Sequence, residues 1–243
     1  MSVIKIKVSA VSYTNTKPFL YGLKHSGILD KVELSLDIPS DCAKKLINNE
    51  VDIGLIPIAA LLSIPNYKII SEYCIGSDGP VNSVFIFSNK PIEEVKTIRL
   101  DNESRTSNAL ARVLIQKYWN CNPAFIYSGA ADAYIEIGDR TFGKINQAAF
   151  VYDLAGEWKK FTGLPFAFAV WASNKNLSEQ FLKEFNDALK FGVNNIPAVL
   201  SELPTRDDFD LTDYLTHKLD FLLDNSKRLA IDKFLSYIKE LRT

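Results

Sequence analysis

The chain has 243 residues, of which 47% are hydrophobic, 12% aromatic and 23% charged, and this globular composition excludes disordered, collagen-like and coiled-coil chains. Its 28 basic and 29 acidic side chains give a formal net charge of -1. The chain therefore lacks the broad basic field of nucleic-acid-binding proteins, and an anionic ligand has to be held by local hydrogen-bond donors.

The first part of the chain alternates between strands and short helices. Proline near the first turn of a helix is favourable because the N–H it lacks has no helical partner there. The pattern predicts, in chain order, a strand from residue 3 to about Val11, a polar turn at 12–16, a helix opened by Lys17 and Pro18, a strand at 32–38, a helix capped by Ser40 or Asp41, and a short buried strand at 52–57. Strands that alternate with helices predict a mostly parallel sheet.

A second series of strands and helices follows a turn at Ser77–Pro80. It is predicted as a strand at 83–88, a strand at 97–100, a polar turn at 101–107, a helix bearing Leu110, Val113, Leu114 and Tyr118, a strand at 135–138, a helix at 153–162 and an apolar strand at 166–171. The last strand carries no charge, which suits burial on both faces. Beyond Ser173 the pattern predicts packing helices, one of which shares Phe181, Phe185, Ala188 and Leu189 on one face.

The two series predict an α/β protein with two lobes. The crossings between them are expected near Ser88–Lys90 and Ala172–Asn174. One lobe is then discontinuous, with residues 1–88 and 174–243, and the other has residues 89–173. Two lobes joined by two short crossings form a hinge, and the cleft between them is the expected ligand site.

Polar turns follow several predicted strands, where open α/β sheets bind ligands. The turns are Ser12–Lys17, Ser77–Ser83, Ser104–Ser107 and Ile137–Asp139. Hydroxyl groups and free N–H groups at a helix start form an anion site, but a helix-capping role fits the Ser104–Ser107 turn and Asp139 equally well. None of these turns has a glycine-rich phosphate signature, so nucleotide binding has no support.

Cysteine and histidine are few. Cys42, Cys74 and Cys121 lie far apart, which argues against disulfides or a zinc site and favours small buried side chains in a reducing compartment. His25 and His217 belong to no recognisable motif. The sequence predicts no metal, no cofactor, no membrane span and no signal peptide, and therefore a cytoplasmic location. It makes no prediction of oligomeric state.

Six blocks in order resemble the chorismate dehydratases of the futalosine route to menaquinone. They are Val11–Pro18, Asp78–Val84, Ser104–Ser107, Ile137–Asp139, Tyr152–Leu154 with Glu157–Trp158, and Phe168–Ala172. The resemblance covers about residues 3–172 and is weak over the C-terminal helices. It implies a two-lobed fold like the type II periplasmic solute-binding proteins, and dehydration of chorismate to 3-[(1-carboxyvinyl)oxy]benzoate.

The resemblance also implies a set of site residues. Asn15 and Ser83 are expected to be catalytic, and the substrate-binding residues are expected to be Ser12, Thr16, Pro57, Gly79, Arg105, Thr106, Ser107, Gly138 and Asp139. Chorismate is a dianion, and we expect Thr106 and Ser107 to hold one carboxylate while Ser12, Asn15 and Ser83 orient the ring or the other carboxylate. The base is expected to be the substrate's own enolpyruvyl carboxylate, with Asp139 as the alternative.

Three other functions stay open. The first is a non-catalytic solute-binding protein for a small carboxylate, although such proteins are usually exported and the sequence shows no export signal. The second is the related 1,4-dihydroxy-6-naphthoate synthase, although the turn at Ser12–Thr16 and the block at Asp78–Val81 fit the dehydratases better. The third is a LysR-type effector domain, for which the sequence shows no DNA-binding segment.

Overall fold

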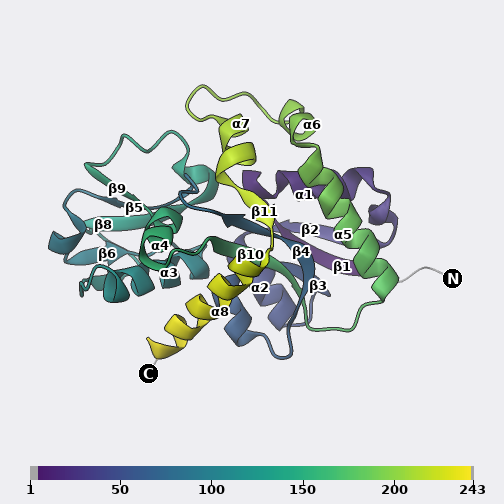
Figure 1. The fold of residues 1–243 in the computed structure, drawn as a ribbon, viewed down its shortest axis with the longest axis horizontal. Helices are drawn as coiled ribbons and strands as arrows, with labels where there is room; N and C mark the ends of the chain where they lie inside the picture. The colour runs from purple at the N-terminus through teal and green to yellow at the C-terminus, as the bar shows by residue number, and fades with distance from the viewer. Residues whose placement is uncertain (1–4, 242–243) are drawn as a thin grey trace.

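The fold consists of two β-sheets with helices packed against them (Figure 1). The structure is a computed structural model that describes residues 5–241, so the predicted start of the first strand at residues 3 and 4 lies outside the described residues. In the view of Figure 1 the smaller sheet lies on the left and the larger sheet lies towards the right. The prediction of a two-lobed α/β protein is confirmed.

The larger sheet has six strands in the order β11-β4-β10-β3-β1-β2. Its strands are β1 (Ile6–Val11), β2 (Val32–Asp37), β3 (Ile53–Pro57), β4 (Lys68–Ser77), β10 (Phe166–Ser173) and β11 (Asp220–Leu222). The smaller sheet has five strands in the order β7-β6-β8-β5-β9. They are β5 (Val84–Ser88), β6 (Thr97–Arg99), β7 (Ala124–Ile126), β8 (Ala133–Ile137) and β9 (Phe150–Asp153).

The helices cover the faces of these sheets, and a helix is the last element of the chain. The α-helices are α1 (Lys17–His25), α2 (Pro39–Ile47), α3 (Arg105–Lys117), α4 (Leu154–Thr162), α5 (Glu179–Asn194), α6 (Ile196–Ser201), α7 (Leu211–Asp213) and α8 (Asn225–Glu240). The short 3-10 helices are η1 (Thr14–Thr16), η2 (Ile28–Asp30), η3 (Ile58–Ser63), η4 (Ile92–Glu94) and η5 (Gly138–Thr141), and η6 (Tyr214–Lys218) is a π-helix.

Helix starts follow the sequence signals except at α2. Ser104 caps α3 and Asp153 caps α4, each with a side-chain oxygen that accepts backbone N–H groups of the first turn. The predicted cap of α2 is wrong: the helix begins at Pro39, and neither Ser40 nor Asp41 is its cap residue. The cap residue is Ile38, whose side chain cannot cap the helix, and Pro39 supplies the first turn with the backbone angle that a helix needs.

The predicted mostly parallel sheet is wrong, because both sheets are mixed. In the larger sheet β1 runs parallel to β2 and β3, whereas β10 runs antiparallel to both β3 and β4. The reason is topological: β10 re-enters this sheet from the other lobe and travels in the opposite direction. Its eight residues are all buried, as its uncharged sequence predicts.

The predicted lobe boundaries do not match the way in which the strands are divided between the two sheets. Strand β5 pairs with β8 and β9 in the smaller sheet, and β10 pairs with β3 and β4 in the larger one. The predicted crossings at Ser88–Lys90 and Ala172–Asn174 therefore come after these strands. The chain changes sheets before each of them, at 78–83 and at 163–165. Periodicity finds a strand, but only pairing shows which sheet it joins.

The described cysteines are free thiols, and two of them are fully buried. Burial raises the pKa of Cys42 and of Cys74 to about 12, from an ordinary value of 9.0. We expect neither thiol to react with a thiol reagent at pH 8 in the native protein, and both to react after denaturation, in a thiol titration. Because folding favours the protonated thiols, their contribution to stability is present below pH 9 and is lost as the pH rises towards 12. Rapid native-state labelling of Cys42 would contradict this expectation.

Candidate active site

A cleft lies between the two sheets and is lined by uncharged groups. Its polar side chains come from the end of β1, the crossing before β5 and the start of α3, and they are Tyr13, Asn15, Ser83, Ser104, Thr106 and Ser107. Its apolar walls come from both sheets and from the start of α2, and they include Pro39, Pro57, Ile75, Ile137 and Phe168. Among the described lining residues none carries a charge, so an anion here is held by neutral donors and by the helix start.

The start of α3 presents hydroxyl groups to the cleft. The Ser104 hydroxyl donates to the hydroxyl oxygen of Ser107 at 2.8 Å and accepts the Ser107 N–H at 3.0 Å. The hydroxyl oxygen of Thr106 accepts the N–H of Ala59, in the other lobe, at 3.1 Å. Both Thr106 and Ser107 therefore keep their own hydroxyl hydrogens available, and the positive end of the helix dipole adds to the attraction for an anion.

A tyrosine from the C-terminal part of the chain contacts both Ser83 and Asn15. Tyr214 is buried, and its hydroxyl donates to the hydroxyl oxygen of Ser83 at 2.9 Å and also interacts with the Asn15 side chain. Burial raises the pKa of Tyr214, which keeps it a neutral donor. Because Ser83 accepts this bond, its own hydroxyl hydrogen is free to point into the cleft.

The loop that carries Ser83 is fixed by backbone contacts. Asn82 has a positive φ of 57°, and its N–H donates to the Asp153 carboxylate at 2.7 Å. The same carboxylate caps α4, and burial raises its pKa. On the other side, the N–H of Gly138 donates to the Ser83 carbonyl at 2.8 Å. Three of the six sequence blocks are thus joined around Ser83.

Gly138 is required at its position for two reasons. Its φ is +64°, a region that favours glycine, and an added Cβ would lie 2.8 Å from the ring of Tyr13. The close approach of Tyr13 to this turn brings a residue of one lobe against the backbone of the other.

Asp139 connects the lobes rather than facing the cleft. Its carboxylate accepts the Thr14 N–H at 3.0 and 3.1 Å and the Thr14 hydroxyl at 2.9 Å. It is not the cap residue of η5, whose N-cap is Ile137. The alternative that Asp139 merely caps its own helix is therefore wrong, and its partner is the turn that bears Asn15.

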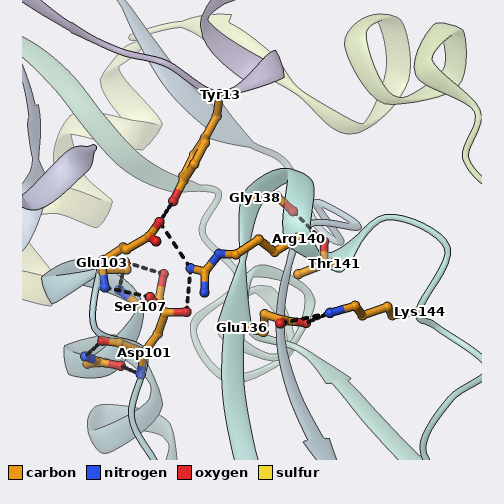
Figure 2. A network of polar contacts seen from close by, with 11 residues as sticks. Tyr13, Asp101, Glu103, Ser107, Glu136, Gly138, Arg140, Thr141 and Lys144 are labelled. Atoms are coloured by element: carbon orange, nitrogen blue, oxygen red, sulfur yellow. Dashed lines mark hydrogen bonds and ion pairs between the residues drawn. The ribbon is translucent and has the colours of Figure 1, made fainter. Parts of the chain in front are cut away.

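A charged network beside the cleft makes a further contact between the lobes. Figure 2 shows the Tyr13 hydroxyl pointing at the Glu103 carboxylate, to which it donates a hydrogen bond, and Arg140 extending towards Asp101 and Glu103. Arg140 lies 2.7 Å from Asp101 and 3.4 Å from Glu103. Burial of the Tyr13 hydroxyl beside Glu103 raises the pKa of Tyr13, so it stays a donor. Arg140 offsets the charge of the two carboxylates.

The cleft brings together part of the predicted site. The predicted residues that line it are Asn15, Pro57, Ser83, Thr106, Ser107 and Gly138. The predicted residues that lie outside its lining are Ser12, Thr16, Gly79, Arg105 and Asp139. Ser12 is exposed, and the buried Thr16 donates to the side-chain oxygen of Asn15 at 3.1 Å. Gly79, with a φ of +109°, shapes the crossing loop.

Three polar residues at the site were not predicted. Tyr13 and Ser104 fall inside quoted blocks, where the turn and the cap pattern are the signals that point to them. Tyr214 has no local signal, because it lies 131 residues from Ser83 in a segment whose periodicity indicates packing alone. No three histidine, cysteine, aspartate or glutamate side chains within residues 5–241 are grouped as a metal ion requires.

Two lobes around a cleft are the arrangement of the periplasmic-binding-protein-like fold. A Candida albicans gene product described as having the generic periplasmic binding protein structural fold has a TM-score of 0.63 at 13% identity, covering 99% of this chain and 92% of its own. A crystal structure of an Archaeoglobus fulgidus protein has a TM-score of 0.71 at 17% identity, covering 98% and 97%. At such identities these similarities show the fold.

The chain belongs to the family described as menaquinone biosynthesis, whose model matches residues 6–240. It is also similar to a Campylobacter jejuni protein named chorismate dehydratase, with 26% identity over 242 residues, which is 95% of this chain and 96% of that relative. Within residues 5–241 no helix is both long and apolar enough to cross a membrane.

Proposed function

We propose that this chain dehydrates chorismate to 3-[(1-carboxyvinyl)oxy]benzoate, a step in menaquinone biosynthesis. The family membership and the similarity to a chorismate dehydratase support this function. The single structural observation that carries it is the convergence of Asn15, Ser83, Thr106 and Ser107 on one cleft. The blocks that bear these residues are far apart in the chain and carry the resemblance in the sequence.

The reaction removes water and makes the ring aromatic. A C–H bond breaks at the ring carbon that bears the enolpyruvyl ether, the C–O bond of the neighbouring hydroxyl breaks, and the proton and hydroxide leave as water. Aromatisation supplies the driving force, so the protein has to bind the dianion, orient it and stabilise the charge that develops on the leaving oxygen.

In our proposal each polar group of the cleft has one task. Thr106 and Ser107 at the start of α3 hold one carboxylate with their free hydroxyl hydrogens and the helix dipole. Asn15 orients the ring. Ser83, which accepts the Tyr214 hydrogen bond, donates a hydrogen bond to the departing hydroxide and keeps its own proton, and the bond from Tyr214 strengthens that donor. Tyr214 acts through Ser83 and is a positioning residue.

The base in this proposal is the enolpyruvyl carboxylate of the substrate. None of the described residues that line the cleft is a carboxylate, a histidine or a lysine. Asp139, the alternative base, lies outside the lining, and its carboxylate accepts hydrogen bonds from the N–H and the hydroxyl of Thr14. A substrate carboxylate held close to its own C–H bond needs only correct orientation to act.

Incubation of the purified protein with chorismate tests the function. We expect the absorbance of the cyclohexadiene to fall and an aromatic product of the dehydrated mass to appear by liquid chromatography and mass spectrometry. Saturable binding of chorismate without turnover would instead support the solute-binding alternative. Turnover of a later intermediate of the route but not of chorismate would support the 1,4-dihydroxy-6-naphthoate synthase. A cytoplasmic location stays a prediction of the sequence, and cell fractionation tests it.

Asp139→Asn separates the two candidate bases. We expect the variant to keep turnover, with kcat lowered less than about tenfold and KM raised, because it loses a charge-assisted contact between the lobes and no base. Thr14→Val is the matched control, since it removes the hydroxyl from the same contact and should also raise KM. Loss of turnover in Asp139→Asn with chorismate binding intact, and normal turnover in Thr14→Val, would make Asp139 the base.

A further inference from the structure

Arg105 belongs to the Ser104–Ser107 block, yet it lines a different cavity from the cleft. This cavity, which we call the α3 pocket, has a volume of about 400 Å³. It lies between α3, η3 and the end of α8, and its lining includes Ala59, Arg105, Arg112, Tyr127 and Ile238. Thr106 and Ser107 of the same helix line the cleft instead, so the first turn of α3 separates the two cavities.

The α3 pocket is positively charged. Arg105 and Arg112 are seven residues apart in α3, and Asn108 and Ala109 between them also line the pocket, so one face of the helix borders it. No acidic side chain is among the described lining residues, and within residues 5–241 neither guanidinium has an ion-pair partner. Two like charges facing one depression repel each other, and a bound anion relieves that repulsion.

The rest of the α3 pocket suits an apolar body. Leu100, Ala109, Ile238 and Leu241 form its aliphatic walls. The Tyr127 side chain is 68% exposed, which leaves its ring available for contact. The Arg112 guanidinium lies 4.0 Å from the centre of the Phe125 ring, a contact that holds its flat group in place and leaves its hydrogen-bond donors free for a carboxylate.

We propose that the α3 pocket is a second ligand site, which binds a small carboxylate that carries a ring or another apolar body. Arg105 and Arg112 bind the carboxylate, and Tyr127 with the aliphatic walls covers the body. The ligand contacts both lobes, since Ala59 and Ser63 come from η3 and the arginines from α3. Ala59 also donates the backbone hydrogen bond to Thr106 in the cleft, so the two sites share a wall.

Titration with benzoate, followed by backbone amide NMR in phosphate-free buffer, tests this proposal. The amides of Ala109 and Ile238 report on the α3 pocket, and those of Ser107 and Gly138 report on the cleft. We expect saturable shifts at Ala109 and Ile238, and a Kd raised at least about tenfold in the variant with both R105Q and R112Q, because charge-assisted bonds are lost. Arg228→Gln is the matched control: it removes the same charge from an exposed position in α8 and should leave the Kd unchanged.

Other outcomes overturn the proposal. They are shifts confined to the cleft amides, an unchanged Kd in the double variant, and an equal loss of affinity in Arg228→Gln, which would show only a long-range charge effect. Inorganic phosphate that binds as tightly as benzoate would show that the apolar walls contribute nothing, and would overturn the ligand class. Should loss of the Arg112 contact with Phe125 prevent folding, the exposed Arg105→Gln variant alone gives the same comparison.

Discussion

Ser83→Ala is expected to lower kcat for chorismate dehydration by about 100- to 1000-fold, the usual cost of removing one donor from a site of developing negative charge. Ser83 is 2% exposed, lines the cleft, and has its hydroxyl hydrogen free because it accepts a bond from Tyr214. Steady-state kinetics should show the loss mainly in kcat, with KM little changed, because the bond to the leaving oxygen forms in the transition state.

Tyr214→Phe serves as the comparison for Ser83→Ala. It keeps the ring, which packs edge-on against Phe142 and Phe209, and removes only the hydroxyl. We expect a smaller fall in kcat, of about tenfold, since one hydrogen bond to Ser83 is lost while Ser83 remains. In the Ser83→Ala background the same change should have almost no further effect on kcat, because the two residues act as a unit.

Two results would contradict the role given to Ser83. One is full activity of Ser83→Ala with chorismate. The other is an additive loss in the double variant, which would mean that Tyr214 acts independently of Ser83. Thermal unfolding of each variant separates a catalytic loss from a folding defect.

Gly22→Ala and Gly192→Ala are each expected to lower the free energy of unfolding by about 1–3 kcal/mol or more. These glycines lie where α1 and α5 cross, and α5 lies beside α1 in Figure 1. A Cβ on Gly22 would overlap the carbonyl oxygen of Ala188, and a Cβ on Gly192 would overlap that of Pro18. Because these neighbours are backbone atoms, the helices have to move apart and lose contacts around the buried Phe19 and Leu189.

The expected fall in the free energy of unfolding is opposite in sign to the usual effect of replacing glycine by alanine in a helix. In an uncrowded helix the same substitution stabilises a protein by roughly 0.8–1.0 kcal/mol, since alanine favours helix more than glycine does. Lys190→Ala, at an exposed position of α5, is the matched control and should have almost no effect. Stability is measured by urea unfolding, and an unchanged or higher midpoint in both glycine variants would show that the helices do not cross as closely as described.

Local chemistry allowed much of the fold to be predicted. Alternating residues indicate β1, the Pro18 signal indicates the start of α1, and the shared face of Phe181, Phe185 and Leu189 in α5 is buried. These patterns depend on neighbours within a turn or a strand, and such neighbours are written in the sequence. Capping by the Ser104–Ser107 turn is one of the two interpretations that the sequence offers, and in the structure Ser104 is the cap of α3.

Residue patterns and the family resemblance were enough to predict the two-lobed fold, most of the strands and helices, and the blocks that contribute Asn15, Ser83, Thr106 and Ser107. They did not show which sheet β5 and β10 join, that Asp139 holds Thr14 across the lobes, or that Arg105 faces away from the cleft. The support of Ser83 by Tyr214 is also visible only in the folded protein. The difference follows from the range of the interactions: turns and helix caps are set by adjacent residues, whereas pairing, side-chain direction and contacts between lobes depend on segments that meet only when the whole chain has folded.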